Sequence, residues 1–121
     1  MEPARLTFHL TPADWWEAAD PAAPLSAPSF EAEEFIHCTT GADEMVATAN
    51  RHYRDDPRPF VVLTLDLGRI TAPIRVDDPA GIYPHVFGPL DRAAIIGVQP
   101  MPREADGTFL PFTTDAAGVA G

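Results

Sequence analysis

Three histidines lie within short apolar, strand-like segments, and imidazole is the side chain that ordinarily titrates near neutral pH. The segments are Phe8-His9-Leu10, Phe35-Ile36-His37-Cys38-Thr39 and Tyr83-Pro84-His85-Val86-Phe87. Each one adjoins turn or cap residues, where strands end. We therefore predict that several strand ends bring His9, His37 and His85 into one concave pocket.

Each of these histidines also has a purely structural interpretation. His9 shares its strand face with Thr7 and Thr11, so it is either part of a cleft wall or an ordinary surface residue. His37 shares a face with Thr39, and it is either a site residue or a core histidine bonded to a backbone carbonyl. The pattern alone leaves both alternatives open.

The surroundings of His85 are more constrained. Pro84 precedes it and Gly88-Pro89 follows shortly after, which favours a strand edge or a bulge, where side chains are often directed at sites. The fourth histidine, His52, is expected to be a surface residue of a helix.

Metal and thiol chemistry fit the sequence poorly. His-x-His, His-x-x-x-His and Cys-x-x-Cys spacings are absent. His37 and Cys38 are adjacent, so on a regular strand they point to opposite faces and cannot bind one ion together. Cys38 is expected to be a buried, inert thiol. We predict no metal site, and the sequence also lacks glycine-rich phosphate-binding motifs.

Composition excludes further classes. The 121 residues fit one domain, and the 18 acids and eight bases give a formal net charge of −10. Such a charge disfavours nucleic-acid partners but leaves room for a small anionic ligand held by one or two arginines. All the bases are arginine, which excludes lysine Schiff-base chemistry. The sequence has no membrane-spanning apolar run, no signal-peptide pattern and one cysteine, so we expect a cytoplasmic protein without a membrane partner.

The N-terminal half contains the predicted helices. A strand over residues 5–10 precedes a short helix that ends at about residue 19, with Thr11 as its N-cap and Trp15 and Trp16 packed beneath it. A second helix follows a strand over residues 35–39, with Thr40 as its cap and Asp43 at the capping-box position. The second helix has an apolar stripe at helical spacing, formed by Met45, Val46, Ala49 and Tyr53.

Strands dominate the rest of the chain. Phe60–Asp66 is nearly all apolar and is predicted to be the central strand. Shorter strands are expected over residues 74–77, 83–87 and 94–98. The prediction is a single α+β domain over residues 1–102, with five or six strands and two helices, followed by a Pro/Gly/Ala-rich tail over residues 103–121. The proline-rich loop after residue 20 is either a lid or, as its composition favours, a plain surface crossing.

Several of these segments together resemble the bacterial domain-of-unknown-function family 952. The similarity covers the residue 35–39 segment, Ala49-Asn50-Arg51-His52-Tyr53-Arg54, Ile74-Arg75-Val76-Asp77 and the block Tyr83-Pro84-His85-Val86-Phe87-Gly88-Pro89-Leu90, in that order along the chain. Two positions depart from the family pattern. Glu34 stands where the family usually has glycine, and Phe87 stands where it usually has tyrosine.

The resemblance implies a fold similar to the ADP-ribosyltransferase domains, a bent, split β-sheet that holds NAD in a cleft. In that superfamily a first-strand histidine or arginine holds the adenosine ribose, and His9 matches this role by position. His85 stands where the toxins of the superfamily carry glutamate, so protein ADP-ribosylation is not implied. The expected catalytic residues are therefore His85 and His37, and the expected cofactor-binding residues are His9, Thr11, Thr39, Asn50, Arg75 and Tyr83.

Three functional hypotheses remain. The first is an NAD-using or ADP-ribose-processing enzyme with a histidine-lined pocket. The second is a non-catalytic domain that binds a nucleotide or another small anion on the same scaffold. The third is an interaction domain without a small-molecule site.

Overall fold

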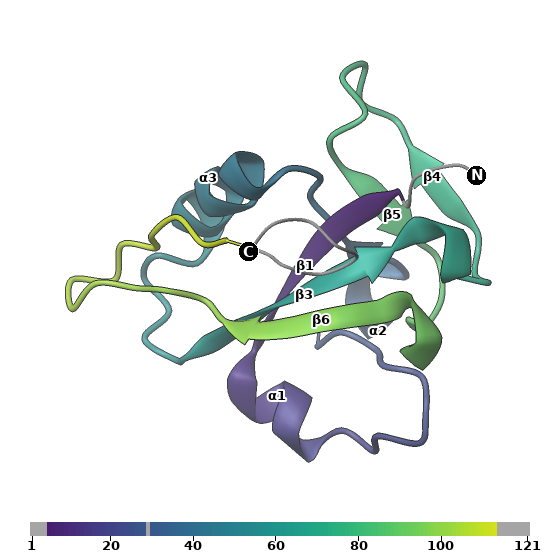
Figure 1. Ribbon diagram of the computed structural model, residues 1–121, viewed down its shortest axis with the longest axis horizontal. Coiled ribbons are helices and arrows are strands. Elements are labelled where there is room, and N and C mark those ends of the chain that lie inside the picture. The colour runs from purple at the N-terminus through teal and green to yellow at the C-terminus, as the bar shows by residue number, and fades with distance from the viewer. Residues whose placement is uncertain (1–4, 29, 114–121) are drawn as a thin grey trace.

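Two three-stranded antiparallel sheets form the framework of the protein in a computed structural model, which describes residues 5–28 and 30–113 (Figure 1). In the first sheet, β3 (Phe60–Asp66) lies between β1 (Leu6–Pro12) and β6 (Ile95–Pro100). In the second, β5 (Pro84–Val86) lies between β2 (Ile36–His37) and β4 (Ile74–Val76). The predicted α+β class is confirmed, and so is the central position of β3.

Strand β3 explains why both faces of the first sheet are buried. Phe60 and Val62 belong to one apolar cluster, together with Met45 and Ala49 of a helix. Val61, Leu63 and Leu65 belong to a second cluster, together with Ile36 and Val86 of the second sheet. Successive strand residues point to opposite faces, so a strand that is apolar at nearly every position supplies both clusters.

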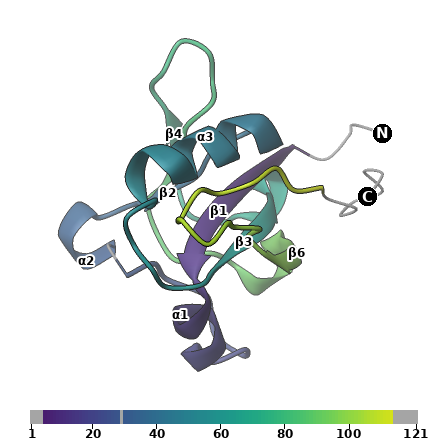
Figure 2. The same cartoon turned by 90° about the vertical axis from the view of Figure 1, so that its left-hand side faces the viewer.

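Three α-helices occur in the described residues: α1 (Ala13–Ala18), α2 (Phe30–Glu33) and α3 (Ala42–His52). Short 3₁₀-helices, η1 (Leu67–Arg69) and η2 (Arg92–Ala94), follow β3 and precede β6. Helix α3 lies beside β1 (Figure 2). Its predicted stripe is confirmed, because Met45 and Ala49 are buried and Val46 and Tyr53 pack against the same cluster. The four-residue helix α2 was not predicted. None of the helices among the described residues is long and apolar enough to cross a membrane.

The predicted helix caps are wrong. Thr11 is a buried residue inside β1, and α1 follows Pro12 without a side-chain cap. Thr40 donates its hydroxyl hydrogen to Oγ1 of Thr7 instead of capping α3, which starts after Gly41 at φ +97°. Trp15 is 40% exposed, so only Trp16 packs partly against the core.

The predicted tail begins too early. Phe109 and Phe112 are buried in the cluster that contains Phe8, and Arg103 forms an isolated β-bridge with Phe109. The Arg103 guanidinium also lies 4.3 Å from the centre of the Phe109 ring. Residues 103–113 are therefore part of the domain, whereas the prediction for residues 114–121 lies outside the described residues.

The loop after α1 is attached at several points. Leu25 and Leu90 exchange two backbone hydrogen bonds of 2.9 and 2.7 Å. The Arg92 guanidinium donates to the carbonyls of Asp20 and Ala23 and lies over the ring of Trp16. These contacts fit a surface crossing that is tied to the domain, and they hold Ala27 and Pro28 beside β1.

Candidate functional site

The site lies where the two sheets part, along the outer edge of β1. Phe8 and Thr39 exchange two backbone hydrogen bonds of 2.9 and 2.8 Å, which join the edge of β1 to the segment after β2. Beyond this bridge β1 runs on to Pro12, with β3 on its other side. Helix α3 and residues 27–28 flank this edge, and a cavity lies between them.

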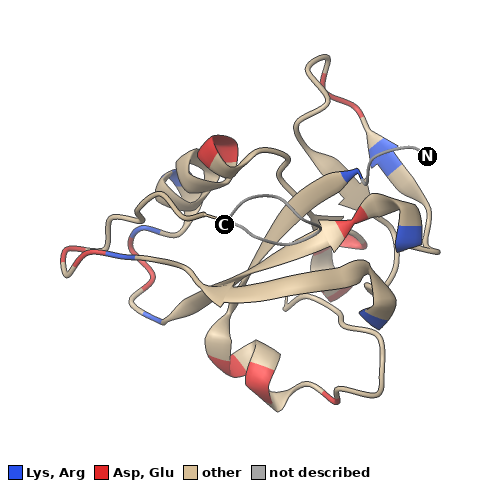
Figure 3. Cartoon of the chain, in the orientation of Figure 1, with Lys and Arg blue, Asp and Glu red and all other residues tan. Residues whose placement is uncertain are grey.

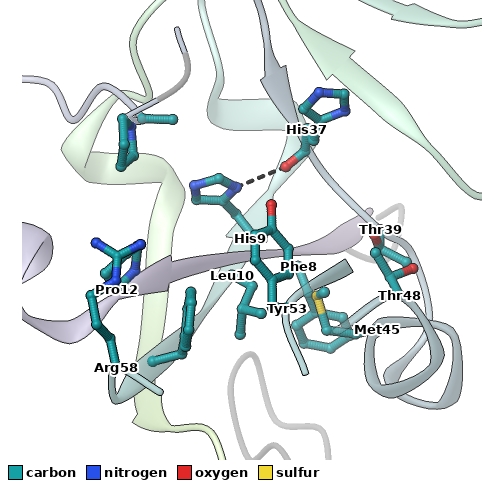
Figure 4. Close-up of a pocket in the computed structure, with 13 residues that line it drawn as sticks. Phe8, His9, Leu10, Pro12, His37, Thr39, Met45, Thr48, Tyr53 and Arg58 are labelled. Atoms are coloured by element: carbon teal, nitrogen blue, oxygen red, sulfur yellow. Dashed lines mark hydrogen bonds between the residues drawn. The ribbon is translucent and has the colours of Figure 1, made fainter. Parts of the chain in front are cut away.

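The cavity has a volume of about 140 Å³. Figure 4 shows labelled lining residues converging from β1, from β2 and the segment after it, and from α3 and the segment between α3 and β3. Most of them are apolar or aromatic, and the full set is Phe8, His9, Leu10, Pro12, Ala27, Pro28, His37, Thr39, Met45, Thr48, Tyr53, Arg58 and Phe60.

His9 is the most unusual group in this wall. Its side chain is 6% exposed, and its Nδ1 lies 2.7 Å from the carbonyl oxygen of His37. Its Nε2 is buried without a hydrogen-bond partner among the described residues. Burial lowers the pKa of His9 from 6.5 to about 4, the carbonyl of His37 opposes this shift, and the His37 ring adds to it. His9 is therefore neutral at pH 7.

A larger hollow adjoins the cavity, with a volume of about 380 Å³. The residues that line both are His37, Thr39, Thr48 and Tyr53. Those that line the hollow alone are Glu33, Cys38, Arg51, His52, Tyr83 and His85. Because the two spaces share a wall, one extended ligand could occupy both.

The outer face of the second sheet carries a row of polar and aromatic rings. His37 and His85 are paired across β2 and β5, and their ring centres lie 5.4 Å apart. The ring of Phe35 stacks on His85 at 4.3 Å. The side chain of His37 is 48% exposed, and its Nε2 lies 2.7 Å from Oε2 of Glu33. Burial, and then the neighbouring His37, lower the pKa of His85, so the neutral form of His85 is favoured.

The structure brings the three predicted histidines together in two pairs. His9 and His37 line the cavity, and His37 and His85 line the larger hollow. Thr39 lines both spaces, and Tyr83 lines the hollow. The predicted single pocket is thus two adjoining spaces that share His37.

Three predicted cofactor-binding residues line neither space. The Asn50 amide group is occupied by the backbone of Phe109, which accepts at 3.1 Å and donates at 2.7 Å. Arg75 of β4 pairs with Asp77, which follows the strand. The hydroxyl of Thr11 is buried without a partner among the described residues. Asn50 therefore has a structural role here.

Sequence reasoning missed several lining residues. The sequence places Tyr53 in the apolar stripe of α3, but the side chain is only partly buried and lines both spaces. Thr48 lies on the same helix, and its hydroxyl is also buried and unpaired within the described part of the chain. Arg58 is an exposed lining residue outside any motif, and His52, which is exposed as expected, also lines the hollow.

The Cys38 thiol in the wall of the larger hollow is deeply buried. Burial raises the pKa of Cys38 to about 12, so the thiol is protonated and unreactive at neutral pH. Over residues 5–28 and 30–113, no cluster of three or more histidine, cysteine or acidic side chains has an arrangement that could hold a metal ion.

The protein is thus a small α+β domain with two antiparallel three-stranded sheets and a histidine-lined cavity at the edge of one of them. The chain belongs to the family described as "Protein of unknown function (DUF952)", which it matches over residues 10–98. This match confirms the family resemblance that the sequence segments indicated.

Solved structures of one relative share the fold. The crystal structure of protein CC0527 from Caulobacter crescentus has a TM-score of 0.72 and 19% sequence identity, covering 88% of this chain and 94% of that one. A double mutant of CC0527 matches equally well. Its solution NMR structure has a TM-score of 0.63 and 21% identity, covering 84% and 89% of the two chains. None of the curated proteins compared with the chain matches it.

Proposed function

We propose that the protein binds a nucleotide-like small molecule across the cavity and the larger hollow, with NAD and ADP-ribose as the first ligands to test. The observation that carries this proposal is the buried, neutral imidazole of His9, whose unpaired Nε2 lies in the wall of an apolar cavity. Pockets for small molecules typically combine apolar walls with a few placed polar groups. The resemblance to ADP-ribosyltransferase-like domains supports the choice of ligands.

The charges around the site agree with a single small anion better than with a polyanion. Arg58 lines the cavity and Arg51 lines the hollow, so a phosphate group could be met locally. Elsewhere acidic residues are spread over several elements (Figure 3), within a net charge of −10. A polynucleotide would be repelled by this field.

Calorimetry and thermal shift test the binding. NAD or ADP-ribose should raise the melting temperature, because a ligand of the folded state stabilises it by mass action. His9→Asn should weaken binding, whereas Thr11→Val should not, because Thr11 lies on the same strand face but lines neither space. Tight binding of RNA but of neither dinucleotide would contradict the proposal.

A second candidate function is turnover of such a ligand, with His85 as the group that handles a proton. The favouring observation is its position beside the Glu33–His37 pair, where burial lowers the pKa of His85 and so favours the neutral ring. One general base typically contributes about 10²–10⁴ in rate. His85→Ala should therefore reduce the rate of NAD or ADP-ribose breakdown by about 10²–10⁴. Chromatography of the products measures this rate. Val76→Thr, on the neighbouring strand β4, is the control, and full activity in His85→Ala would leave a binding domain.

A further inference from the structure

In the cavity beside β1, Nε2 of His9 is a hydrogen-bond acceptor, as the contact of the other ring nitrogen shows. The carbonyl of His37 can only accept, so Nδ1 of His9 at 2.7 Å must carry the hydrogen. A neutral imidazole has a single N–H, and Nε2 therefore presents a bare lone pair. In Figure 4 this second nitrogen points away from His37.

The size of the cavity limits what this acceptor can meet. At about 140 Å³, it matches the roughly 150 Å³ apolar cavity that accommodates benzene in another protein. A whole dinucleotide does not fit, but one six-membered ring does. The aromatic side chains of Phe8, Tyr53 and Phe60 line the space, and flat rings pack well against such walls.

Further donors in the wall complete the chemistry. Burial, together with Glu33 and Asp56, raises the pKa of Tyr53, so its hydroxyl keeps its hydrogen at neutral pH. The buried Thr48 hydroxyl also has no partner among the described residues. The wall therefore offers hydroxyl donors as well as the His9 acceptor to a ring substituent that both donates and accepts, such as a carboxamide.

We propose that this cavity is a subsite for a single planar ring bearing an N–H or O–H donor, which Nε2 of His9 accepts. The inference rests on the proposed function, since the ring would be one part of a nucleotide-like ligand whose remainder lies in the larger hollow. His9 selects by hydrogen-bond direction: an ester cannot donate to Nε2, and a carboxylate places its own lone pairs against it.

Three ring compounds of nearly equal size test the selection in the unmodified protein. Benzamide should bind, methyl benzoate should bind about tenfold more weakly because it leaves a buried acceptor unpaired, and benzoate should bind more weakly than benzamide. NMR titration measures all three, and donation to Nε2 should shift the ¹⁵N resonance of that nitrogen. Equal affinity for benzamide and its ester would overturn the proposal. A preference for benzoate would assign recognition to Arg58 instead.

The substitution His9→Asn distinguishes the roles of the two ring nitrogens. An asparagine amide can still donate to the carbonyl of His37, but it offers nothing at the position of Nε2. Benzamide affinity should fall to that of the ester, and ester affinity should not change. Thr11→Val should leave the tenfold preference intact. If His9→Asn fails to fold, the three-compound comparison still decides.

The ring subsite and the proposed function fail in different ways. If NAD and ADP-ribose do not bind but benzamide does, with the expected preference, the subsite stands and the nucleotide proposal falls. If a dinucleotide binds but benzamide shows no preference over its ester, the nucleotide proposal stands and the subsite is wrong.

Discussion

The buried neutral state of His9 predicts a specific loss of stability in mild acid. The unfolded chain takes up a proton at His9 below pH 6.5, whereas the folded protein does so only near pH 4. Between these values the unfolded state binds more protons, so the free energy of unfolding falls as the pH falls. The stability contribution of a neutral His9 is fully present above pH 6.5.

The size of the effect follows from the two pKa values. From pH 8 to pH 5 the free energy of unfolding should fall by about 2 kcal/mol through His9 alone. That is a large fraction of the roughly 5–15 kcal/mol that stabilises a typical domain. Asp56, Asp78, Asp91 and Asp106 also have lowered pKa values, but their contributions are lost mainly below pH 4.

Urea unfolding of the unmodified protein and of His9→Asn at pH 8 and pH 5 measures the effect. Asparagine does not titrate, so the difference between the two proteins should change by about 2 kcal/mol. His85, whose pKa is also lowered, is present in both proteins and largely cancels. A difference that stays constant from pH 8 to pH 5 would refute the buried neutral state. An NMR titration midpoint of His9 well above pH 4 would refute it as well.

Three substitutions test the backbone features of the fold by urea unfolding. Glu34→Gly should stabilise by about 1 kcal/mol, because Glu34 has φ +66° after α2; unchanged stability would argue against that conformation. Gly107→Ala should destabilise by about 2 kcal/mol or more, because its Cβ would lie 2.5 Å from the Arg54 carbonyl at φ +98°; a neutral result would exclude this close approach. Asn50→Ala should cost about 2–3 kcal/mol, because it leaves the Phe109 backbone unpaired; wild-type stability would place Asn50 at the surface.

The spacing of apolar residues along the chain correctly predicted several helices and strands. Strand β3 is apolar at nearly every position, which requires burial on both faces whatever covers them. The stripe of α3 at helical spacing predicted its buried side from four residues alone. The strand periodicity around His85 likewise predicted β5. In each case neighbouring residues in the chain carry the signal.

The helix starts show where local signals fail. Thr11 and Thr40 have the sequence of N-caps, but Thr11 continues β1 opposite Val61 and Thr40 bonds to Thr7 across the structure. Tertiary contacts outweigh a cap because a cap is worth only about 1 kcal/mol. Phe109 and Phe112 follow a Pro- and Gly-containing stretch, and only the completed cluster around Phe8 buries them.

The environment of His9 was decided by tertiary structure alone. Alternation along β1 placed His9 on the same face as Thr7 and Thr11, but it did not say what covers that face. The second sheet covers it, and the Phe8–Thr39 bridge joins residues 31 positions apart to do so. The same bridge places the His37 carbonyl against Nδ1 of His9. The sequence by itself determined the presence of the histidine and the face it occupies. Its neutral charge and the direction of its free lone pair depend on the fold, because desolvation is set by residues distant in the chain.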